Sequence, residues 1–141
     1  MTVDARANDI RDEFEFLDDW ETRYAHIIDL GKANPALLPH ERTEETRVRG
    51  CASQVWMVMD ETGDDTLKIR AESDAMIVSG LIALLIRLFS GGKRDDILAF
   101  DAPAFLEEIG VTGALSAQRS NGLASMLERI RTAASAETTG G

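Results

Sequence analysis

The chain of 141 residues contains a single cysteine, Cys51, and only two histidines, His26 and His40. One cysteine cannot form an internal disulfide, so nothing in the sequence indicates a disulfide-stabilised secreted protein. A structural zinc site needs four cysteine or histidine ligands, and an iron–sulfur cluster usually needs four thiolates. We therefore expect no metal site, with His26 on the flank of a helix and His40 in solvent.

The lone cysteine also limits the redox chemistry open to the chain. The sequence has no C-x-x-C pair and no second thiol to resolve a disulfide, which excludes a dithiol oxidoreductase. A cysteine hydrolase would need a histidine base near Cys51, and a histidine distant in sequence leaves that class open. The remaining chemistry ends at one sulfur atom: persulfide carriage, mixed-disulfide formation or peroxide sensing.

Positive charge is scarce, and no hydrophobic run is long. The chain has 15 basic and 25 acidic residues, and its net charge of −10 argues against nucleic acid and against an anionic membrane surface. It favours a partner with a basic or mixed docking patch. The most apolar stretch, residues 75–89, is too short to span a bilayer and contains Arg87. Residues 1–11 lack the apolar core of a signal peptide, so we expect a cytoplasmic protein.

The composition is that of one globular domain. Apolar residues make up 44% of the chain and charged residues 28%, which are ordinary values for a folded protein. A chain of this length can bury a single hydrophobic core. We predict one domain over residues 1–134 and a flexible C-terminal tail over residues 135–141, where small residues predominate.

Hydrophobic periodicity predicts two helices near the N-terminus. Ile10, Phe14 and Leu17 recur at a spacing that places them on one helical face. A second helix is expected from Asp18, which can cap it, to Gly31, a typical C-terminal stop. Residues 34–45 contain two prolines and many charges and are predicted to form a loop.

The middle of the chain has the pattern of strands. Residues 46–50 and 54–59 flank Cys51, and residues 66–71 alternate apolar and polar side chains, as in a sheet with one buried face. The short connections between these segments favour antiparallel pairing.

The second half of the chain is predicted to be helical. Ser73 can cap a long apolar helix that ends near Phe89, and Asp101 and Ser116 can cap two later helices. The predicted fold class is therefore α+β: a three-stranded antiparallel sheet packed with helices.

Cys51 has neighbours that suit a reactive thiol. Gly50 frees the backbone beside the sulfur, and the guanidinium groups of Arg47 and Arg49 would favour the thiolate. The alternative from these residues alone is a small buried hydrophobic side chain, which most single cysteines are.

Four segments of the chain resemble one family. Residues 48–56 resemble the G-C-x-S-Q-V-W signature of the SufE family of sulfur-acceptor proteins. Residues 24–31 resemble the second helix of that family, residues 73–81 its S-D-A-x-I-V-x-G-L segment, and residues 119–123 the R-x-x-G-L start of its last helix. The segments occur in the family's order, which makes the match far more specific than any one of them.

Two positions depart from the family pattern. Ala52 stands where a glutamine is usual, which we expect to alter hydrogen bonding around the thiol. Ala117 stands where proline is frequent, which should weaken the pre-organisation of a helix start.

The resemblance implies a function as well as a SufE/IscU-like fold. SufE proteins take persulfide sulfur from a pyridoxal-phosphate-dependent cysteine desulfurase, SufS, and stimulate its turnover. They hold the sulfur on the cysteine matched by Cys51 and pass it to the SufBCD scaffold, where iron–sulfur clusters are assembled. The pyridoxal phosphate belongs to the desulfurase, so the resemblance implies no cofactor and no enzyme activity of its own for this chain.

Two alternatives stay open at this point. The close relative CsdE serves the desulfurase CsdA, and the sequence does not separate that pathway from the SufS pathway. A single-thiol redox sensor or an adaptor protein would also fit one reactive cysteine.

The sequence also leads to expectations about the site. We expect Cys51 on a loop between two strands, with Gly50 permitting the turn and with Ser53 and Gln54 bonding the loop backbone. Arg119 is a candidate for a charge near the thiol, although a solvated arginine at a helix start is equally plausible.

Shielding of the sulfur leads to two further expectations. A persulfide is readily lost to other thiols, so we expect the helix of residues 75–89 and Trp56 to cover it until a partner docks. Asp74 is either a docking contact for a basic patch on that partner or a simple complement to the helix dipole.

Overall fold

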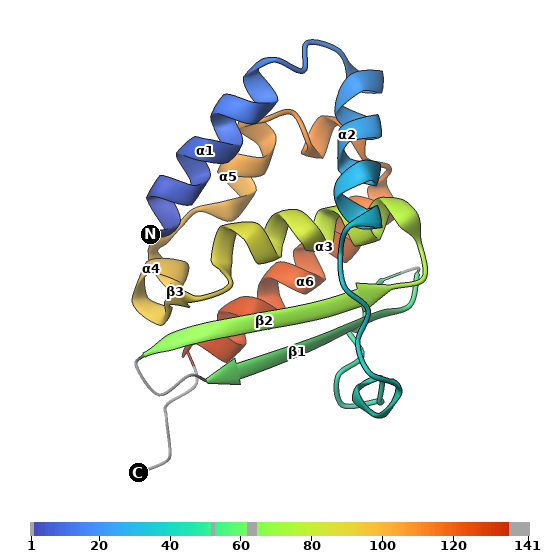
Figure 1. The fold of residues 1–141 in the computed structure, drawn as a ribbon, viewed down its shortest axis with the longest axis vertical. Helices are drawn as coiled ribbons and strands as arrows, with labels where there is room; N and C mark the ends of the chain where they lie inside the picture. The colour runs from blue at the N-terminus through green and yellow to red at the C-terminus, as the bar shows by residue number, and fades with distance from the viewer. Residues whose placement is uncertain (1, 52, 62–64, 136–141) are drawn as a thin grey trace.

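The computed structural model describes residues 2–51, 53–61 and 65–135 (Figure 1). The elements follow one another in the order α1 (Val3–Glu15), α2 (Trp20–Lys32), the 3-10 turn η1 (Pro39–Glu41), β1 (Val55–Glu61), β2 (Thr66–Ser73), α3 (Met76–Phe89), β3 (Gly92–Lys93), α4 (Arg94–Ala99), α5 (Ala102–Glu108), the 3-10 turn η2 (Thr112–Ala114) and α6 (Ala117–Ser135).

The three strands form one antiparallel sheet in the order β1-β2-β3. β1 pairs with β2 from Val55↔Ser73 to Glu61↔Leu67, and β2 pairs with β3 at Thr66↔Lys93 and Leu67↔Gly92. The predicted α+β class with a three-stranded antiparallel sheet is therefore confirmed.

One of the predicted strands is wrong. The third strand is β3, whereas residues 46–50 make only a single bridge, Arg47↔Trp56. Backbone hydrogen bonds join Val48 N to Val55 O and Met57 N to Thr46 O, both at 2.8 Å. Gly50 then takes a φ of +88°, which turns the chain away from β1 before a ladder can form.

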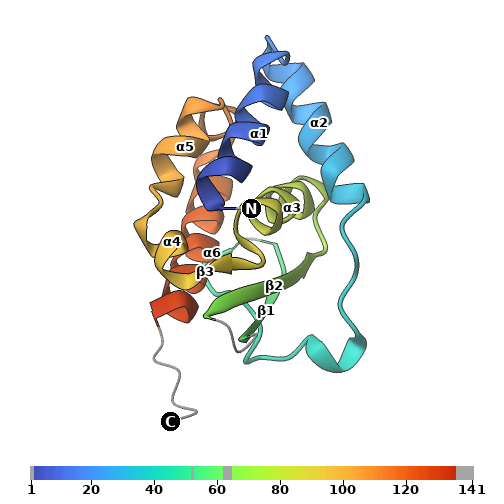
Figure 2. The same cartoon turned by 60° about the vertical axis from the view of Figure 1, so that its left-hand side comes forward.

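The helices pack against one face of this sheet. Leu67, Ile69 and Ala71 of β2 are buried, and α3 packs against that strand. Figures 1 and 2 show α3 lying along the sheet, α6 next to it, and α1 and α2 farther from the strands. The alternation predicted for residues 66–71 is confirmed.

Two glycines set the contact between α2 and α3. A Cβ atom on Gly80 would lie 2.0 Å from the carbonyl oxygen of Ile27, and one on Gly31 would lie 2.6 Å from Gly80 N. The two backbones touch at this point. Gly31 was expected to stop the helix, but α2 continues to Lys32, because Gly31 is required for close packing rather than for termination.

Several helix caps differ from the prediction by one or two residues. Asp19, not Asp18, caps α2 by accepting from Thr22 N at 2.7 Å. Ser73 is the last residue of β2, and Ala75 is the cap position of α3. Asp101 and Ser116 accept from Ala104 N at 3.1 Å and from Arg119 N at 3.3 Å, so both predicted caps are confirmed.

The end of the last helix meets the predicted tail. α6 runs to Ser135, the first residue of that tail, and residues 136–141 lie outside the described residues.

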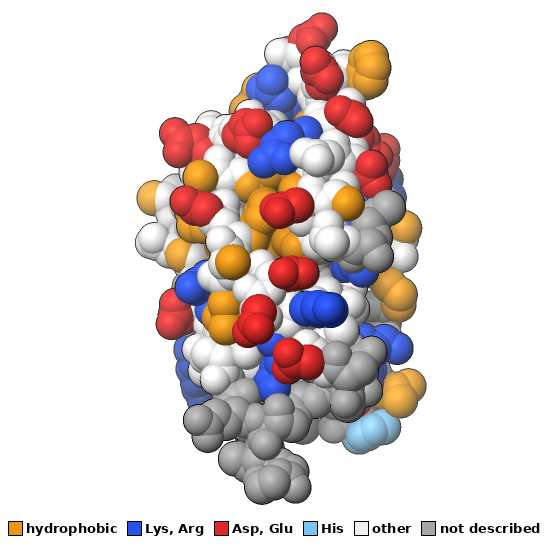
Figure 3. Space-filling view, turned by 90° about the vertical axis from the view of Figure 1, so that its left-hand side faces the viewer, with side chains coloured by type: hydrophobic (Ala, Val, Ile, Leu, Met, Phe, Trp, Pro, Cys, Tyr) orange, Lys and Arg blue, Asp and Glu red, His pale blue; other side chains and the backbone are white. Residues whose placement is uncertain are grey.

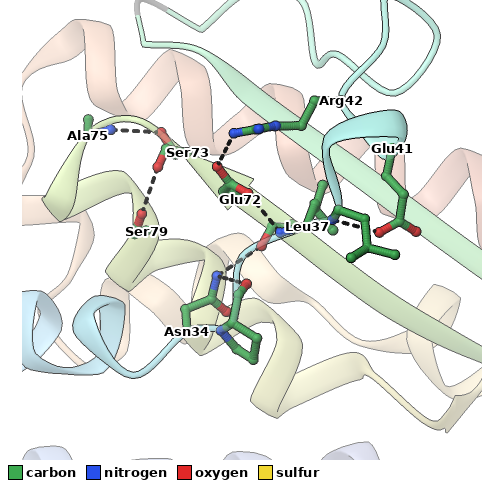
Figure 4. Close-up of polar contacts among 11 residues, drawn as sticks. Asn34, Leu37, Glu41, Arg42, Glu72, Ser73, Ala75 and Ser79 are labelled. Carbon is green, nitrogen blue, oxygen red and sulfur yellow. Dashed lines mark hydrogen bonds and ion pairs between the residues drawn. The ribbon is translucent and has the colours of Figure 1, made fainter.

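The segment between α2 and β1 is attached to β2 by side chains (Figure 4). Asn34 Nδ2 donates to Ala71 O at 2.9 Å, and the Glu72 carboxylate accepts from Leu37 N at 2.7 Å and from Arg42 Nη1 at 3.1 Å. Residues 34–45 were predicted to be a loop, and the structure adds the short turn η1, which begins at Pro39.

Glu41 and Arg70 join this segment to the sheet by a two-pronged ion pair. Arg70 Nη1 and Nη2 donate to Glu41 Oε1 and Oε2 at 2.8 and 2.6 Å. The bonds from Arg70, with one from Leu38 N, lower the pKa of Glu41 from 4.5 to about 2.

This pair predicts a loss of stability in acid that Glu41→Gln should reduce. Because the folded-state pKa of Glu41 is depressed, its carboxylate stabilises the fold above pH 4.5, and that contribution is lost as the pH falls to about 2. Thermal unfolding followed by circular dichroism across this range should show a weaker pH dependence for Glu41→Gln than for the wild type.

Glu44→Gln is the matched control for that measurement. Glu44 pairs with Arg49 at 3.0 Å, but the two side chains are 75% and 76% exposed, so the pair should contribute little. Equal pH dependence in Glu41→Gln and the wild type would contradict the prediction.

Candidate functional site

Cys51 lies on a short loop that rests on α6. We call residues 49–51 and 53–54 the thiol loop. The loop leaves the bridge at Val48 and rejoins the sheet at Val55. Gly50 occupies the left-handed region expected of the turn, and a Cβ atom there would lie 2.6 Å from Ser125 Oγ. Glycine is therefore needed at this position both for its φ and for the close approach to α6.

The sulfur atom of Cys51 is partly buried between α3 and α6. Its thiol donates to the carbonyl oxygen of Gly122 at 3.5 Å. A Cβ atom on Gly122 would lie 3.4 Å from the sulfur, so the absence of a side chain leaves space there. A cavity of about 20 Å³ adjoins the thiol, and its walls are formed by Cys51, Ser53, Val78, Leu81, Gln118, Arg119, Gly122, Leu123 and Met126. That volume suits about one water-sized group.

Burial raises the pKa of the Cys51 thiol. This direction is opposite to the one predicted from Arg47 and Arg49. Desolvation of the thiol is the cause, and Arg49, whose side chain is exposed, pairs with Glu44 at 3.0 Å instead. In the free protein the thiol is therefore held in its protonated, weakly nucleophilic form.

Gln54 and Asp74 fix the downstream end of the loop. Gln54 N donates to Asp74 Oδ1 at 3.0 Å, and Asp74 N donates to Gln54 O at 3.3 Å. The bonding group is therefore the backbone of Gln54, whose side chain is exposed, and Ser53 lines the cavity. Asp74 is exposed and precedes Ala75, the cap position of α3, so it lies just outside the helix whose dipole it was expected to complement.

Of the two groups predicted to cover the sulfur, the helix of residues 75–89 does so and Trp56 does not. α3 contributes Val78 and Leu81, as expected of the helix of residues 75–89. Trp56 does not line the cavity; it lies on the sheet face opposite Val55, with its ring 5.9 Å from the Arg42 guanidinium. α6 supplies the rest of the cover.

Arg119 stands at the mouth of the cavity. It lies in the first turn of α6, its side chain is exposed, and it is one of the lining residues. The structure thus brings Arg119 and Ser53 to Cys51. Ala52, the other residue singled out in the loop, lies outside the described residues.

Sequence reasoning missed the α6 residues around the thiol and one apolar surface residue. A glycine inside a segment with helical periodicity was the available signal for Gly122, since glycine there costs helix stability unless something packs against it. Met76, the first residue of α3, is 54% exposed, and it lies two residues after Asp74 in the sequence. Asp74, which bonds to Gln54 of the loop, is exposed as well.

Elsewhere, the described residues contain neither a grouping of metal ligands nor a helix that could cross a membrane. Within residues 2–51, 53–61 and 65–135, no three side chains of the His, Cys, Asp and Glu types are grouped as a metal site would require. Over the same residues, no helix combines the length and the apolar character that crossing a bilayer demands. Figure 3 shows acidic and basic side chains interspersed around an apolar hollow on the face that carries α1, α4 and α5.

Comparison with known proteins gives consistent matches. Residues 8–134 match the family described as "SufE: Fe-S metabolism associated domain". An uncharacterised SufE-like protein of Rhizobium etli is 48% identical over 130 residues, covering 90% of this chain and 88% of the relative. One from Rhizobium meliloti is 47% identical over 128 residues, covering 89% of this chain and 91% of the relative.

A solved structure has the same fold. The solution structure of a hypothetical protein from Thermus thermophilus superposes with a TM-score of 0.75, at 20% identity, over 92% of this chain and 93% of the other.

Proposed function

This chain belongs to the SufE family, which acts in iron–sulfur metabolism, and we propose that it carries sulfur as a persulfide on Cys51. The donor is a cysteine desulfurase of the SufS type, which the chain also stimulates, and the acceptor is a SufBCD-type scaffold. In this role the chain is an accessory protein without a cofactor of its own. A CsdA-type desulfurase is the alternative donor.

The observation that carries this proposal is the space beside the thiol. The cavity of about 20 Å³ next to Cys51 suits one further atom on the sulfur, and Val78, Leu81, Leu123 and Met126 would keep external thiols from it. The family supplies the donor chemistry, and this cavity supports storage of its product.

The transfer step is a thiol–persulfide exchange. The Cys51 thiolate attacks the outer sulfur of the desulfurase persulfide and forms a new sulfur–sulfur bond. The sulfur–sulfur bond of the donor breaks, and the donor cysteine leaves as a thiolate. No electrons are gained or lost overall, so the exchange needs no oxidant.

Docking must expose the thiol for this attack to occur. Burial raises the pKa of Cys51 in the free protein, so the loop has to move before the thiolate can form and reach the donor. Asp74 bonds to Gln54 of the loop and is exposed, and Met76, two residues later, is also exposed; we assign both to the docking surface. Asp74 would meet a basic patch, and Arg119 would lie near the emerging thiolate.

The raised pKa disfavours the peroxide-sensor alternative. A sensor cysteine reacts as an accessible thiolate of low pKa, whereas Cys51 is partly buried and held as a thiol.

Sulfur loading separates these functions. Wild-type protein incubated with a SufS-type desulfurase and free cysteine should gain the mass of one sulfur atom, which a reductant removes. Peroxide alone should add little oxygen over the same time. Oxygen addition by peroxide with no sulfur addition by the desulfurase would reject the carrier function in favour of a sensor.

Alkylation of Cys51 tests the resting state independently. Iodoacetamide should modify Cys51 in the free protein far more slowly than it modifies an unstructured cysteine peptide, because the thiol is covered and its pKa is raised. Saturating amounts of the desulfurase with an inactivated catalytic cysteine should accelerate modification. A free-protein rate equal to that of the peptide would contradict a covered thiol.

A further inference from the structure

The segment that leads into the thiol loop is bonded to α6 by one arginine. Arg129 Nη1 donates to Arg47 O at 3.1 Å, and Nη2 donates to Glu45 O. A guanidinium presents its donors in a planar fork, which suits two neighbouring carbonyl oxygens.

The sheet does not use these two carbonyls. Thr46 O and Val48 N bond to β1, as shown above, and Glu45 lies in a turn closed by the hydrogen bond from Arg47 N to Thr43 O at 3.0 Å. Among the described residues, the carbonyls of Glu45 and Arg47 accept no backbone hydrogen bond. Arg129 supplies their hydrogen-bond donors instead.

The same helix face touches the loop at two more points. Gly122, Ser125 and Arg129 follow one another at i, i+3 and i+7, a spacing that aligns them along α6. Gly122 lies against Cys51 and Ser125 against Gly50. Of the three contacts, the thiol bond is weak and the Ser125 contact is one of packing. The charge-assisted bonds of Arg129 are the strongest.

We infer that Arg129 is a positioning residue for sulfur transfer: its guanidinium clamps α6 to the segment before the thiol loop and so keeps the α6 wall over Cys51. Gly122, Leu123 and Met126 are the buried residues of that wall. The role of Arg129 in sulfur transfer rests on the proposed function. The hydrogen bonds that form the clamp are present in the free protein and do not depend on it.

An ordinary surface arginine would behave differently. Among the described residues, no carboxylate lies within ion-pair distance of Arg129, so its guanidinium bonds to the two carbonyls instead. Without the clamp, α6 and the loop would be held mainly by packing, and the covered state would be less populated.

The alkylation rate of Cys51 in the free protein tests the clamp. Arg129→Ala should be modified about tenfold faster than the wild type, since a bond to a charged group contributes on that scale. Arg129→Lys can still donate to one carbonyl and should lie between the two. Arg131→Ala is the matched control, because Arg131 donates from the same helix to Leu98 O at 3.1 Å, away from the loop.

The clamp is overturned if Arg129→Ala is modified no faster than the wild type, or if Arg131→Ala is accelerated equally. If Arg129→Ala unfolds in the assay, the alkylation rates of Arg129→Lys and Arg131→Lys are compared instead. A faster rate for Arg129→Lys supports the clamp, and equal rates reject it.

Desulfurase kinetics add a readout that lost stability alone would not produce. If the partner binds the uncovered state, raising the population of that state lowers the half-saturating carrier concentration without changing the maximal rate. We expect Arg129→Ala to show this lower concentration, and an unchanged value would reject the use of the clamp in transfer. Absence of loading in the wild type would instead reject the proposed function and leave the alkylation result standing.

Discussion

Cys51→Ser is expected to abolish sulfur loading and leave the fold intact. A serine hydroxyl does not ionise near neutral pH and does not form a persulfide, so intact-mass measurement should show no added sulfur after incubation with desulfurase and cysteine. The substitution changes one partly buried atom, and the hydroxyl can still donate to Gly122 O. The free energy of unfolding should change by only about 1 kcal/mol.

Cys51→Ala divides binding from chemistry in the same assay. Asp74 and Met76, which we propose as docking residues, are unaltered in this variant, so it should still bind the desulfurase but not accept its sulfur or stimulate its turnover. Undiminished stimulation by Cys51→Ala would show that the chain is an adaptor, and sulfur loading of Cys51→Ser would place the acceptor elsewhere.

Gly122→Ala should shorten the lifetime of the loaded persulfide. The new Cβ atom would lie 3.4 Å from the sulfur of the unmodified thiol, an ordinary contact, so the free protein should fold normally. The outer sulfur of a persulfide would then have to share the small cavity with a methyl group. Overpacking of this kind costs about 1–3 kcal/mol, which corresponds to a loss of protection between about fivefold and about a hundredfold.

Exposure of loaded protein to glutathione, after removal of the desulfurase, measures this protection. The fraction that retains the extra sulfur is followed by mass spectrometry over time. Gly113→Ala is the control, because a Cβ atom on Gly113 meets nothing within 4 Å. Equal persulfide lifetimes in Gly122→Ala and the wild type would show that the outer sulfur does not rest in this cavity.

The parts of the fold that sequence predicted well are those with local signals. Alternation over residues 66–71 and the apolar run of residues 75–89 identified β2 and α3, because burial on one face repeats within a few residues. β3 has only two residues and therefore no period to detect. Adjacent aspartates, Asp18 and Asp19, can both cap a helix, and the choice between them depends on tertiary structure.

The candidate site divides in the same way. Cys51 and Gly50 were identified from neighbouring residues, since the turn and the thiol occupy one short motif. The α6 wall could not be predicted by the same means, because Gly122 reaches the sulfur across 71 residues of chain. Arg129 bonds to Arg47 across 82 residues, and an arginine on a helix carries no sign of such a partner in its sequence.

The long separation between the thiol and its cover has a consequence for synthesis of the protein. Ribosomes build chains from the N-terminus at about 5–20 residues per second, so Cys51 emerges several seconds before Gly122, Leu123 and Met126 exist. During that interval the nascent thiol has no α6 wall and is open to oxidants and to stray persulfides. The protected sulfur site therefore forms only after the last helix has been synthesised, and a chain that ends before α6 would expose the Cys51 thiol.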